Sequence, residues 1–227
     1  MKLVSSLILF FSLFANEACN QSTTPDSKSN IGPKEVVDID TYLAGQTFPG
    51  MERAIVAGGC FWCVEAAYQQ IEGIVESISG YTGGHVKNPS YEAVCTHKTG
   101  HVEAVYLIYD PKIISYSEIL DIFFVAHDPT QLNRQGNDIG ESYKSALYPM
   151  NDAQAEIIES QIAAYNESTF AGKIVTDVQP YDIFWVAEAY HQDFYWNNPN
   201  QGYVRSVSKP KVEKVAKVFK DRLKVKG

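Results

Sequence analysis

A glycine turn between an apolar run and a pair of cysteines constrains this chain more than any other feature. Residues 53–59 (RAIVAGG) are typical of a short buried strand that stops sharply at Gly-Gly. Residues 60–71 (CFWCVEAAYQQI) follow with the apolar spacing of a helix, which Gly73 ends. The pattern therefore predicts a strand, a tight turn and a helix that begins at Cys60.

The predicted helix carries two cysteines, Cys60 and Cys63. The N–H groups and the dipole of a helix start stabilise an anion, so we expect a lowered pKa and a reactive thiolate at Cys60. Cys63 lies one helical turn further on the same face, where it can form a disulfide with Cys60. The alternative is that both cysteines are small hydrophobic residues packed on a sheet.

Composition restricts the remaining choices. The chain has 227 residues, 45% of them hydrophobic, which suits one globular domain with a core. A net charge of −8 argues against nucleic acid as a partner. Four cysteines are too few for a disulfide scaffold. A structural zinc site needs two ligands besides the C-x-x-C pair, which Cys95 with His97 or His101 could supply in principle.

The first nineteen residues are predicted to be an export signal outside the fold. Lys2 precedes an apolar run, residues 4–15, that is shorter than the roughly 20 residues a membrane span needs. Cys19 follows Ala18 at the position where a lipoprotein signal is cut, although the two residues before Ala18 depart from the usual pattern. We expect Cys19 to carry a lipid; a cleaved soluble form and an uncleaved segment are the alternatives.

The rest of the chain is expected to form one domain over residues 51–227. Residues 20–30 are a polar tether, and residues 31–50 complete an N-terminal extension that packs on the surface. Residues 128–143 are expected to be a long ordered loop with a functional role. Strands are predicted at 74–81, 101–109, 144–148 and 174–178, and helices at 115–127, 151–166 and 210–224. This irregular order, with no phosphate loop, predicts an α+β fold.

Three segments carry a family resemblance: GGCFWCVE, then GYTGGHVKNPSYEAVCTHKTGHVEAV, then HDPTQLNRQGNDIGESYKSALY. Together they resemble the A-type peptide methionine sulfoxide reductases, over about residues 54–191. The resemblance implies a single α+β domain with a ferredoxin-like core, in which a mixed sheet is flanked by helices and much irregular chain. It implies thiol-dependent reduction of methionine S-sulfoxide, in proteins and free, and repair of oxidised proteins, without metal, flavin or nucleotide.

The resemblance also assigns roles to residues. A sulfoxide oxygen leaves only once it is protonated, and a carboxyl whose pKa is raised by apolar surroundings can donate that proton. The implied roles are Cys60 as the nucleophile, Glu103 as the acid, Tyr91 and Tyr143 as phenols that hydrogen-bond the oxygen, Phe61 and Trp62 as the wall for the methyl group, Asp138 near the peptide or the recycling step, and His191 at the pocket's edge. The other histidines, His85, His97, His101 and His127, are expected to be structural.

The recycling step departs from the common pattern, because no cysteine follows Cys95 and the family's C-terminal resolving route is absent. Cys63 is the first candidate to resolve the sulfenic acid on Cys60, Cys95 is the second, and an external thiol is the third. A thioredoxin or a thioredoxin-like protein is the expected reductant.

Two other function classes remain open. A general disulfide oxidoreductase would share the C-x-x-C motif, but Phe61-Trp62 is bulky where that class has small residues. A non-catalytic module could retain the methionine pocket. We expect a monomer that is exported by a bacterium, either periplasmic or held at the membrane through an N-terminal lipid.

Overall fold

The computed structural model describes residues 35–225. The predicted signal segment, the lipid site at Cys19 and the tether lie outside the described residues. Among the described helices, none combines the length and the apolar composition that a membrane span requires.

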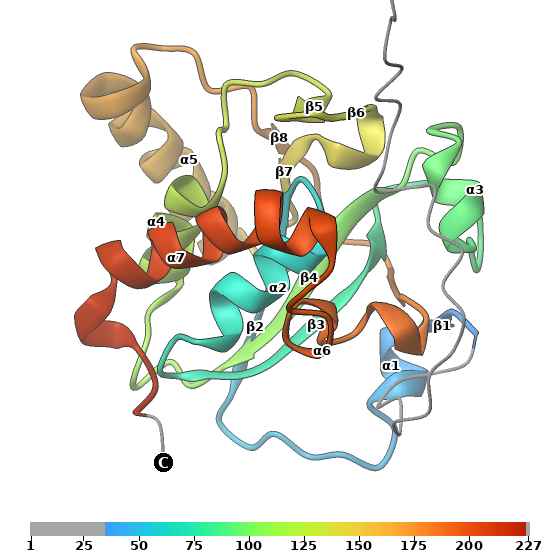
Figure 1. The fold of residues 1–227 in the computed structure, drawn as a ribbon. Helices are drawn as coiled ribbons and strands as arrows, with labels where there is room; N and C mark the ends of the chain where they lie inside the picture. The colour runs from blue at the N-terminus through green and yellow to red at the C-terminus, as the bar shows by residue number, and fades with distance from the viewer. Residues whose placement is uncertain (1–34, 226–227) are drawn as a thin grey trace, which may run out of the picture.

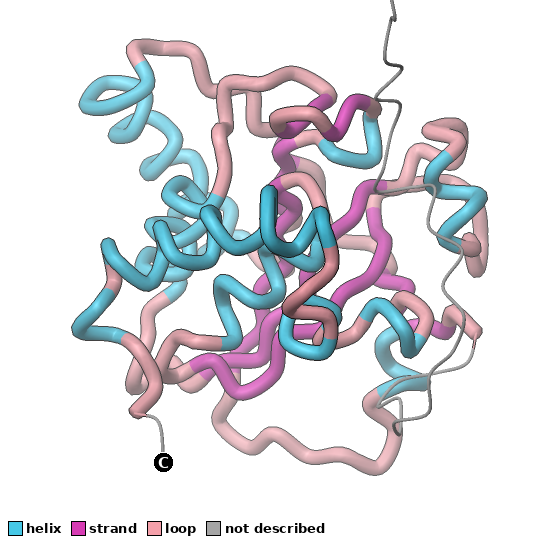
Figure 2. The backbone as a smooth tube through the Cα atoms, in the orientation of Figure 1, coloured by secondary structure: helices cyan, strands magenta, loops and turns pink. Residues whose placement is uncertain are grey.

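A seven-stranded sheet forms the centre of the domain (Figures 1 and 2). Its spatial order is β1-β9-β3-β4-β2-β7-β8, and all pairs are antiparallel except β7 with β8. The mixed sheet and the α+β class are therefore as predicted. The strands are β1 (Val37–Asp38), β2 (Glu52–Gly58), β3 (Ile74–Thr82), β4 (Val102–Tyr109), β7 (Ser145–Leu147), β8 (Asp177–Val178) and β9 (Phe184–Val186).

The middle of the sheet has the ferredoxin-like arrangement. Along the chain, β2, α2 (Phe61–Gln69), β3, β4, α4 (Tyr116–Ala126) and β7 follow one another. In space, β7, β2, β4 and β3 lie side by side, so the first strand of the motif sits between the fourth and the third. Within this motif, α2 connects β2 to β3 and α4 connects β4 to β7 on the same face of the sheet, where α2 packs against β3 and β4.

The sheet is buried on both faces, because residues that alternate along its central strands enter two different cores. Val105 and Leu107 of β4 pack with α2 and α4, whereas Tyr106 and Ile108 face the second core with Ile39. Burial on both faces explains why the sequence of β4 is almost continuously apolar.

The C-terminal helix covers the first core. α7 (Lys209–Val218) directly follows a π-helical turn, Val204–Ser208, and packs against α2 and α4 (Figure 1). Val212 and Val215 are the buried residues of α7. The remaining helices are α1 (Ile39–Tyr42), α3 (Tyr91–Cys95), α5 (Asp152–Tyr165) and α6 (Phe194–Asn197), with short 3-10 turns at Glu141–Tyr143, Ala189–His191 and Lys220–Arg222.

Most of the predicted elements are present with small shifts. The capping box predicted from Ser115 and Glu118 opens α4. The predicted loop 128–143 is more regular than expected, because it contains a two-stranded hairpin, β5 (Arg134–Gln135) with β6 (Asp138–Ile139). The C-terminal helix ends at Val218 rather than near residue 224.

Part of the N-terminal extension belongs to the sheet. β1 pairs with β9 at the edge, with Val37 opposite Val186, and the neighbouring Val36 and Ile39 are buried. The extension was expected to pack on the surface of the domain; this short piece instead completes one edge of the sheet and one side of the second core.

Candidate active site

The predicted strand, turn and helix around Cys60 are present. Gly59 has a φ of +87°, and a Cβ atom there would lie 2.6 Å from the side chain of Gln135, so glycine is required twice over. Cys60 is the N-cap residue of α2, and its carbonyl oxygen accepts from the Cys63 N–H at 3.1 Å. The turn therefore places the thiol at the first residue before the helix.

The two thiols form a buried, hydrogen-bonded pair. Cys60 is 1% exposed and Cys63 is 2% exposed, neither is in a disulfide, and their side chains are hydrogen-bonded to each other. Cys63 Sγ is also hydrogen-bonded to Ser208 Oγ, at 3.2 Å. The spacing in the sequence thus brings both sulfurs to one face of α2, as predicted.

The lowered pKa expected for Cys60 is wrong. Burial raises its pKa, as does the hydrogen bond with Cys63, while that same hydrogen bond lowers the pKa of Cys63 to about 7. The start of the helix does not stabilise a thiolate at Cys60, because the Cys60 side chain makes no cap hydrogen bond. The first N–H of α2, from Phe61, donates to Glu103 instead. Desolvation then decides the direction of the shift.

Glu103 lies in β4 next to the start of α2. Its Oε2 accepts from the Phe61 N–H at 3.0 Å, and the residue is 2% exposed. Burial raises its pKa to about 8, against the opposing effect of that hydrogen bond. The carboxyl is therefore protonated at neutral pH and can donate a proton.

Two phenols surround the same acid and thiol. Tyr91 opens α3 and Tyr143 ends a 3-10 turn, and both are buried. Burial is the first cause that raises the pKa of each, followed by the charge of Glu103, and Cys60 contributes to both shifts. Both phenols are thus protonated, and both lie near Glu103 and Cys60.

An aromatic wall continues from α2. Trp62 Nε1 donates to Nδ1 of His191 at 3.1 Å, and the indole stacks on Phe194 with 3.8 Å between ring centroids. Burial lowers the pKa of His191 to about 3, so its imidazole is neutral and can accept this hydrogen bond. Phe61 also packs against His191, with 5.0 Å between centroids.

Asp138 reaches this site from the hairpin β5–β6. The hydroxyl of Tyr203 donates to its carboxylate, and burial raises the pKa of Asp138. Sequence reasoning did not identify Tyr203 or Phe194 as members of the site. The only signal was the density of aromatic residues between 190 and 203, which does not say which of them point inward.

Residues outside this cluster have other partners. His101 and His127 bind backbone oxygens through a ring nitrogen at 2.7 Å, and His97 contacts Ser142 Oγ at 3.0 Å. Cys95 ends α3. Among residues 35–225, no group of three or more His, Cys, Asp or Glu side chains could hold a metal ion.

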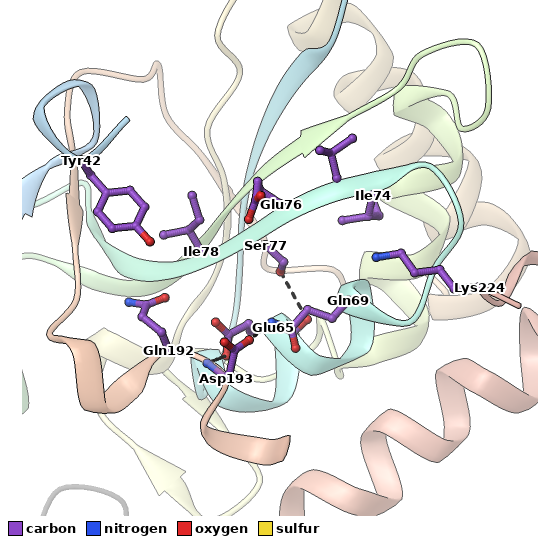
Figure 3. A pocket seen from close by; sticks show the side chains of 11 residues that line it. Tyr42, Glu65, Gln69, Ile74, Glu76, Ser77, Ile78, Gln192, Asp193 and Lys224 are labelled. Carbon is purple, nitrogen blue, oxygen red and sulfur yellow. Dashed lines mark hydrogen bonds between the residues drawn. The ribbon is translucent and has the colours of Figure 1, made fainter. Parts of the chain in front are cut away.

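A separate cavity lies beside another face of α2 (Figure 3). It has a volume of about 120 Å³, and Glu65, Glu76 and Asp193 supply carboxyl groups to its lining. Burial raises the pKa of Glu65, whose Oε2 accepts from the Asp193 N–H at 3.1 Å. None of the predicted site residues lines this cavity.

Comparisons with known proteins identify the family. The family model described as peptide methionine sulfoxide reductase matches residues 52–223. Peptide methionine sulfoxide reductase MsrA of Saccharolobus solfataricus is 49% identical over 175 residues, which cover 77% of this chain and 98% of that protein.

Solved structures show the same fold. Reduced Mxr1 from Saccharomyces cerevisiae has a TM-score of 0.64 at 32% identity and covers 69% of this chain and 91% of its own. Methionine sulfoxide reductase A of Corynebacterium diphtheriae also has a TM-score of 0.64 at 32% identity, covering 68% of this chain and 78% of its own. This chain therefore belongs to the peptide methionine sulfoxide reductase family, A type.

Proposed function

We propose that Cys60 of this chain attacks the sulfur of methionine S-sulfoxide, in proteins and in the free amino acid, and that Glu103 protonates the departing oxygen. One observation carries the proposal: the thiol lies beside a buried carboxyl that is protonated at neutral pH, because its pKa is about 8. A proton donor of that pKa next to a nucleophile is what reduction of a sulfoxide needs.

The first step leaves Cys60 as a sulfenic acid. The pair Cys60–Cys63 holds one proton between its sulfurs above about pH 7, since the pKa of Cys63 is about 7. That proton passes to Cys63 as the Cys60 sulfur bonds to the sulfoxide sulfur, Glu103 gives its proton to the oxygen, and the S–O bond breaks with loss of water. A water molecule then bonds to the Cys60 sulfur and returns a proton to Glu103, while the bond between the two sulfurs breaks and methionine leaves. The product on Cys60 is a sulfenic acid, a reversible oxidation state.

The other site residues bind and orient the substrate. Tyr91 and Tyr143 donate hydrogen bonds to the sulfoxide oxygen, where charge develops. Phe61 and Trp62 hold the S-methyl group, and His191 fixes the indole through the 3.1 Å hydrogen bond from Nε1. Asp138 accepts a hydrogen bond from the Tyr203 hydroxyl. Its role is to contact the incoming peptide or to take part in the recycling step.

Cys63 resolves the sulfenic acid. Its sulfur attacks the sulfur of Cys60, the S–O bond breaks, and the hydroxyl leaves as water with the Cys63 proton. A thioredoxin or thioredoxin-like protein then reduces the Cys60–Cys63 disulfide. The existing hydrogen bond between the two side chains supports Cys63 over Cys95 for this step.

Three serine variants test these roles. With dithiothreitol and a methionine S-sulfoxide peptide, Cys60→Ser should release no methionine. Cys63→Ser should release about one equivalent and then stop with thioredoxin as reductant, whereas Cys95→Ser, the matched control, should keep turning over. A Cys95→Ser chain that stops after one turnover would instead make Cys95 the resolving thiol, and no release by the unmodified chain would refute the function.

We also infer that the protein is exported and acts as a monomer, with residues 1–19 as its signal and Cys19 as the lipid attachment site. The support is the short apolar run before Cys19 and the polar tether after it. Detergent phase partitioning should place the full chain in the detergent phase and a Cys19→Ala chain in the aqueous phase. Equal partitioning of the two chains would refute lipid attachment at Cys19.

A further inference from the structure

A buried ammonium group faces the thiol pair from α7. Lys211 Nζ is shielded from solvent and has no hydrogen-bond partner among the described residues. Lys211 lies three residues after Ser208, one helical turn along, and Ser208 Oγ is the group bonded to Cys63 Sγ at 3.2 Å. Burying an ammonium without a partner is costly, so a nearby negative charge must offset that cost.

Two anionic groups lie within reach of this charge. The hydrogen bond with Cys60 is the main cause of the lowered pKa of Cys63, and the charge of Lys211 adds to it; the same charge opposes the rise in the pKa of Asp138 that burial causes. The carboxylate of Asp138 already accepts a hydrogen bond from Tyr203. Cys63 is bonded by Ser208 and by Cys60, and its thiolate is the group that still needs a cation.

The other titratable groups around Cys63 do not provide that cation. Cys60 shares a proton with it, Glu103 is uncharged at neutral pH, and the Asp138 carboxylate acts in the opposite direction to Lys211. Tyr195 and Tyr203 also interact with Cys63, and burial raises the pKa of both phenols, so they are neutral. Lys211 is the cation in this group.

We propose that Lys211 is a positioning residue that stabilises the Cys63 thiolate for its attack on the Cys60 sulfenic acid, while Ser208 directs the sulfur. The inference rests on the proposed role of Cys63 as the resolving thiol. In this step the Cys63 sulfur forms the S–S bond with Cys60, the S–O bond breaks, and the hydroxide takes up the proton that Cys63 has lost. Two thiol-level electrons of Cys63 thus reduce the sulfenic acid, and no other reductant enters before thioredoxin.

The direct test reads the ionisation of Cys63 itself. In a chain whose other three cysteines are serine, thiolate absorbance near 240 nm is titrated against pH. Lys211→Met keeps most of the side-chain length and removes the charge, so the midpoint should rise by about one pH unit or more. Lys211→Arg should restore the midpoint, and Lys217→Met, an exposed lysine on the same helix, should leave it unchanged.

The kinetic test measures resolution in the chain with all its cysteines. After one equivalent of methionine sulfoxide, the decay of the Cys60 sulfenic acid is followed by trapping and by mass. At pH 7, Lys211→Met should resolve about fivefold more slowly, because a rise of one unit in the Cys63 pKa from about 7 lowers the thiolate fraction from about one half to about one tenth. The difference should vanish above about pH 10, where Cys63 ionises in both chains.

The possible results distinguish the role of Lys211 from that of Cys63 as the resolving thiol. An unchanged Cys63 midpoint in Lys211→Met would mean that Lys211 serves Asp138 alone, and the inference would be wrong while Cys63 stays the resolver. If the unmodified chain forms no Cys60–Cys63 disulfide, the premise itself fails. A shifted midpoint that Lys211→Arg does not restore would point to repacking of α7 and would also refute the inference.

Discussion

The backbone N–H of Phe61 donates to Oε2 of Glu103 at 3.0 Å, across 42 positions of sequence. This bond links the first turn of the thiol helix to the neighbouring strand and holds the acid beside Cys60. It also lowers the pKa of Glu103, yet burial outweighs it and the value stays at about 8. The same bond removes from Cys60 the N–H that would otherwise have stabilised its thiolate.

Replacing the acid should stop the chemistry without removing the bond. Glu103→Gln keeps an oxygen that accepts from Phe61 but has no proton to donate, so methionine release should fall by roughly 10²–10⁴-fold. The measurement is a single turnover with a methionine sulfoxide peptide. Glu65→Gln, at a buried carboxyl on another face of α2, is the matched control and should remain active.

The same carboxyl should give a characteristic pH dependence. Activity of the unmodified chain should decline above about pH 8, where Glu103 loses its proton. Its pKa is raised from 4.5, so its contribution to stability is full below about pH 4.5 and is lost as the pH rises towards 8. Urea unfolding of the unmodified chain should show this decline, and the decline should be smaller in Glu103→Gln, where only other buried carboxyls such as Glu65 still contribute; parallel curves would contradict the assignment.

The imidazole of His191 should fix the substrate wall independently of pH. His191→Phe removes the acceptor of the Trp62 N–H, which frees the indole, and KM should rise roughly tenfold, or about 1.4 kcal/mol. Since the pKa of His191 is about 3, this effect should be constant between pH 5 and 8.

An exposed indole provides the control for that experiment. Trp196 Nε1 donates to Gln69 Oε1, and Trp196 is 50% exposed. Gln69→Leu also removes an indole acceptor, yet KM should not change because this tryptophan lies outside the aromatic wall. Equal rises in KM for both variants would show that a general loss of stability, and not the wall, is responsible.

Two buried tyrosines should respond differently to loss of their hydroxyl groups. The hydroxyl of Tyr203 donates to Asp138, so Tyr203→Phe leaves a buried carboxylate short of a donor and should cost about 1–3 kcal/mol of unfolding free energy. The buried hydroxyl of Tyr116 has no partner among the described residues, and Tyr116→Phe should change stability by less than about 0.5 kcal/mol. Urea denaturation of both variants checks this, and a larger loss in Tyr116→Phe would overturn it.

The glycine before the thiol should tolerate no side chain. Gly59→Ala combines a positive φ with a contact at 2.6 Å to Gln135, whereas Gly136→Ala has a φ of +66° and nothing within 4 Å. The control should therefore lose only about 1 kcal/mol, and Gly59→Ala distinctly more, with lower activity because the turn to Cys60 shifts. Thermal unfolding and methionine release are the two measurements; equal losses would mean that the contact relaxes freely.

Local patterns accounted for much of the architecture. The apolar run before Gly58, the helical spacing after Cys60 and the capping box at Ser115 each predicted an element that is present within a few residues. These predictions succeeded because each depends on neighbours within one or two turns. The hairpin at 134–139 was missed because its strands are two residues long and carry no alternating pattern.

Site membership followed from the family resemblance more than from residue types. Glu103, Tyr91 and Tyr143 would each pass for ordinary strand, helix or turn residues, yet the structure brings all three around Cys60. Phe194 and Lys211 join the site from the C-terminal third of the chain, where no motif indicated them.

Neighbouring residues alone predict the strand, the glycine turn and the two thiols on one face of a helix, because backbone geometry and helical periodicity are local properties. The ionisation of those thiols depends instead on contacts between distant segments. Desolvation, the Phe61–Glu103 hydrogen bond and the ammonium of Lys211 come from segments far apart in the chain. A pKa reports everything buried around a group, and that environment exists only once β4, α2 and α7 have packed together.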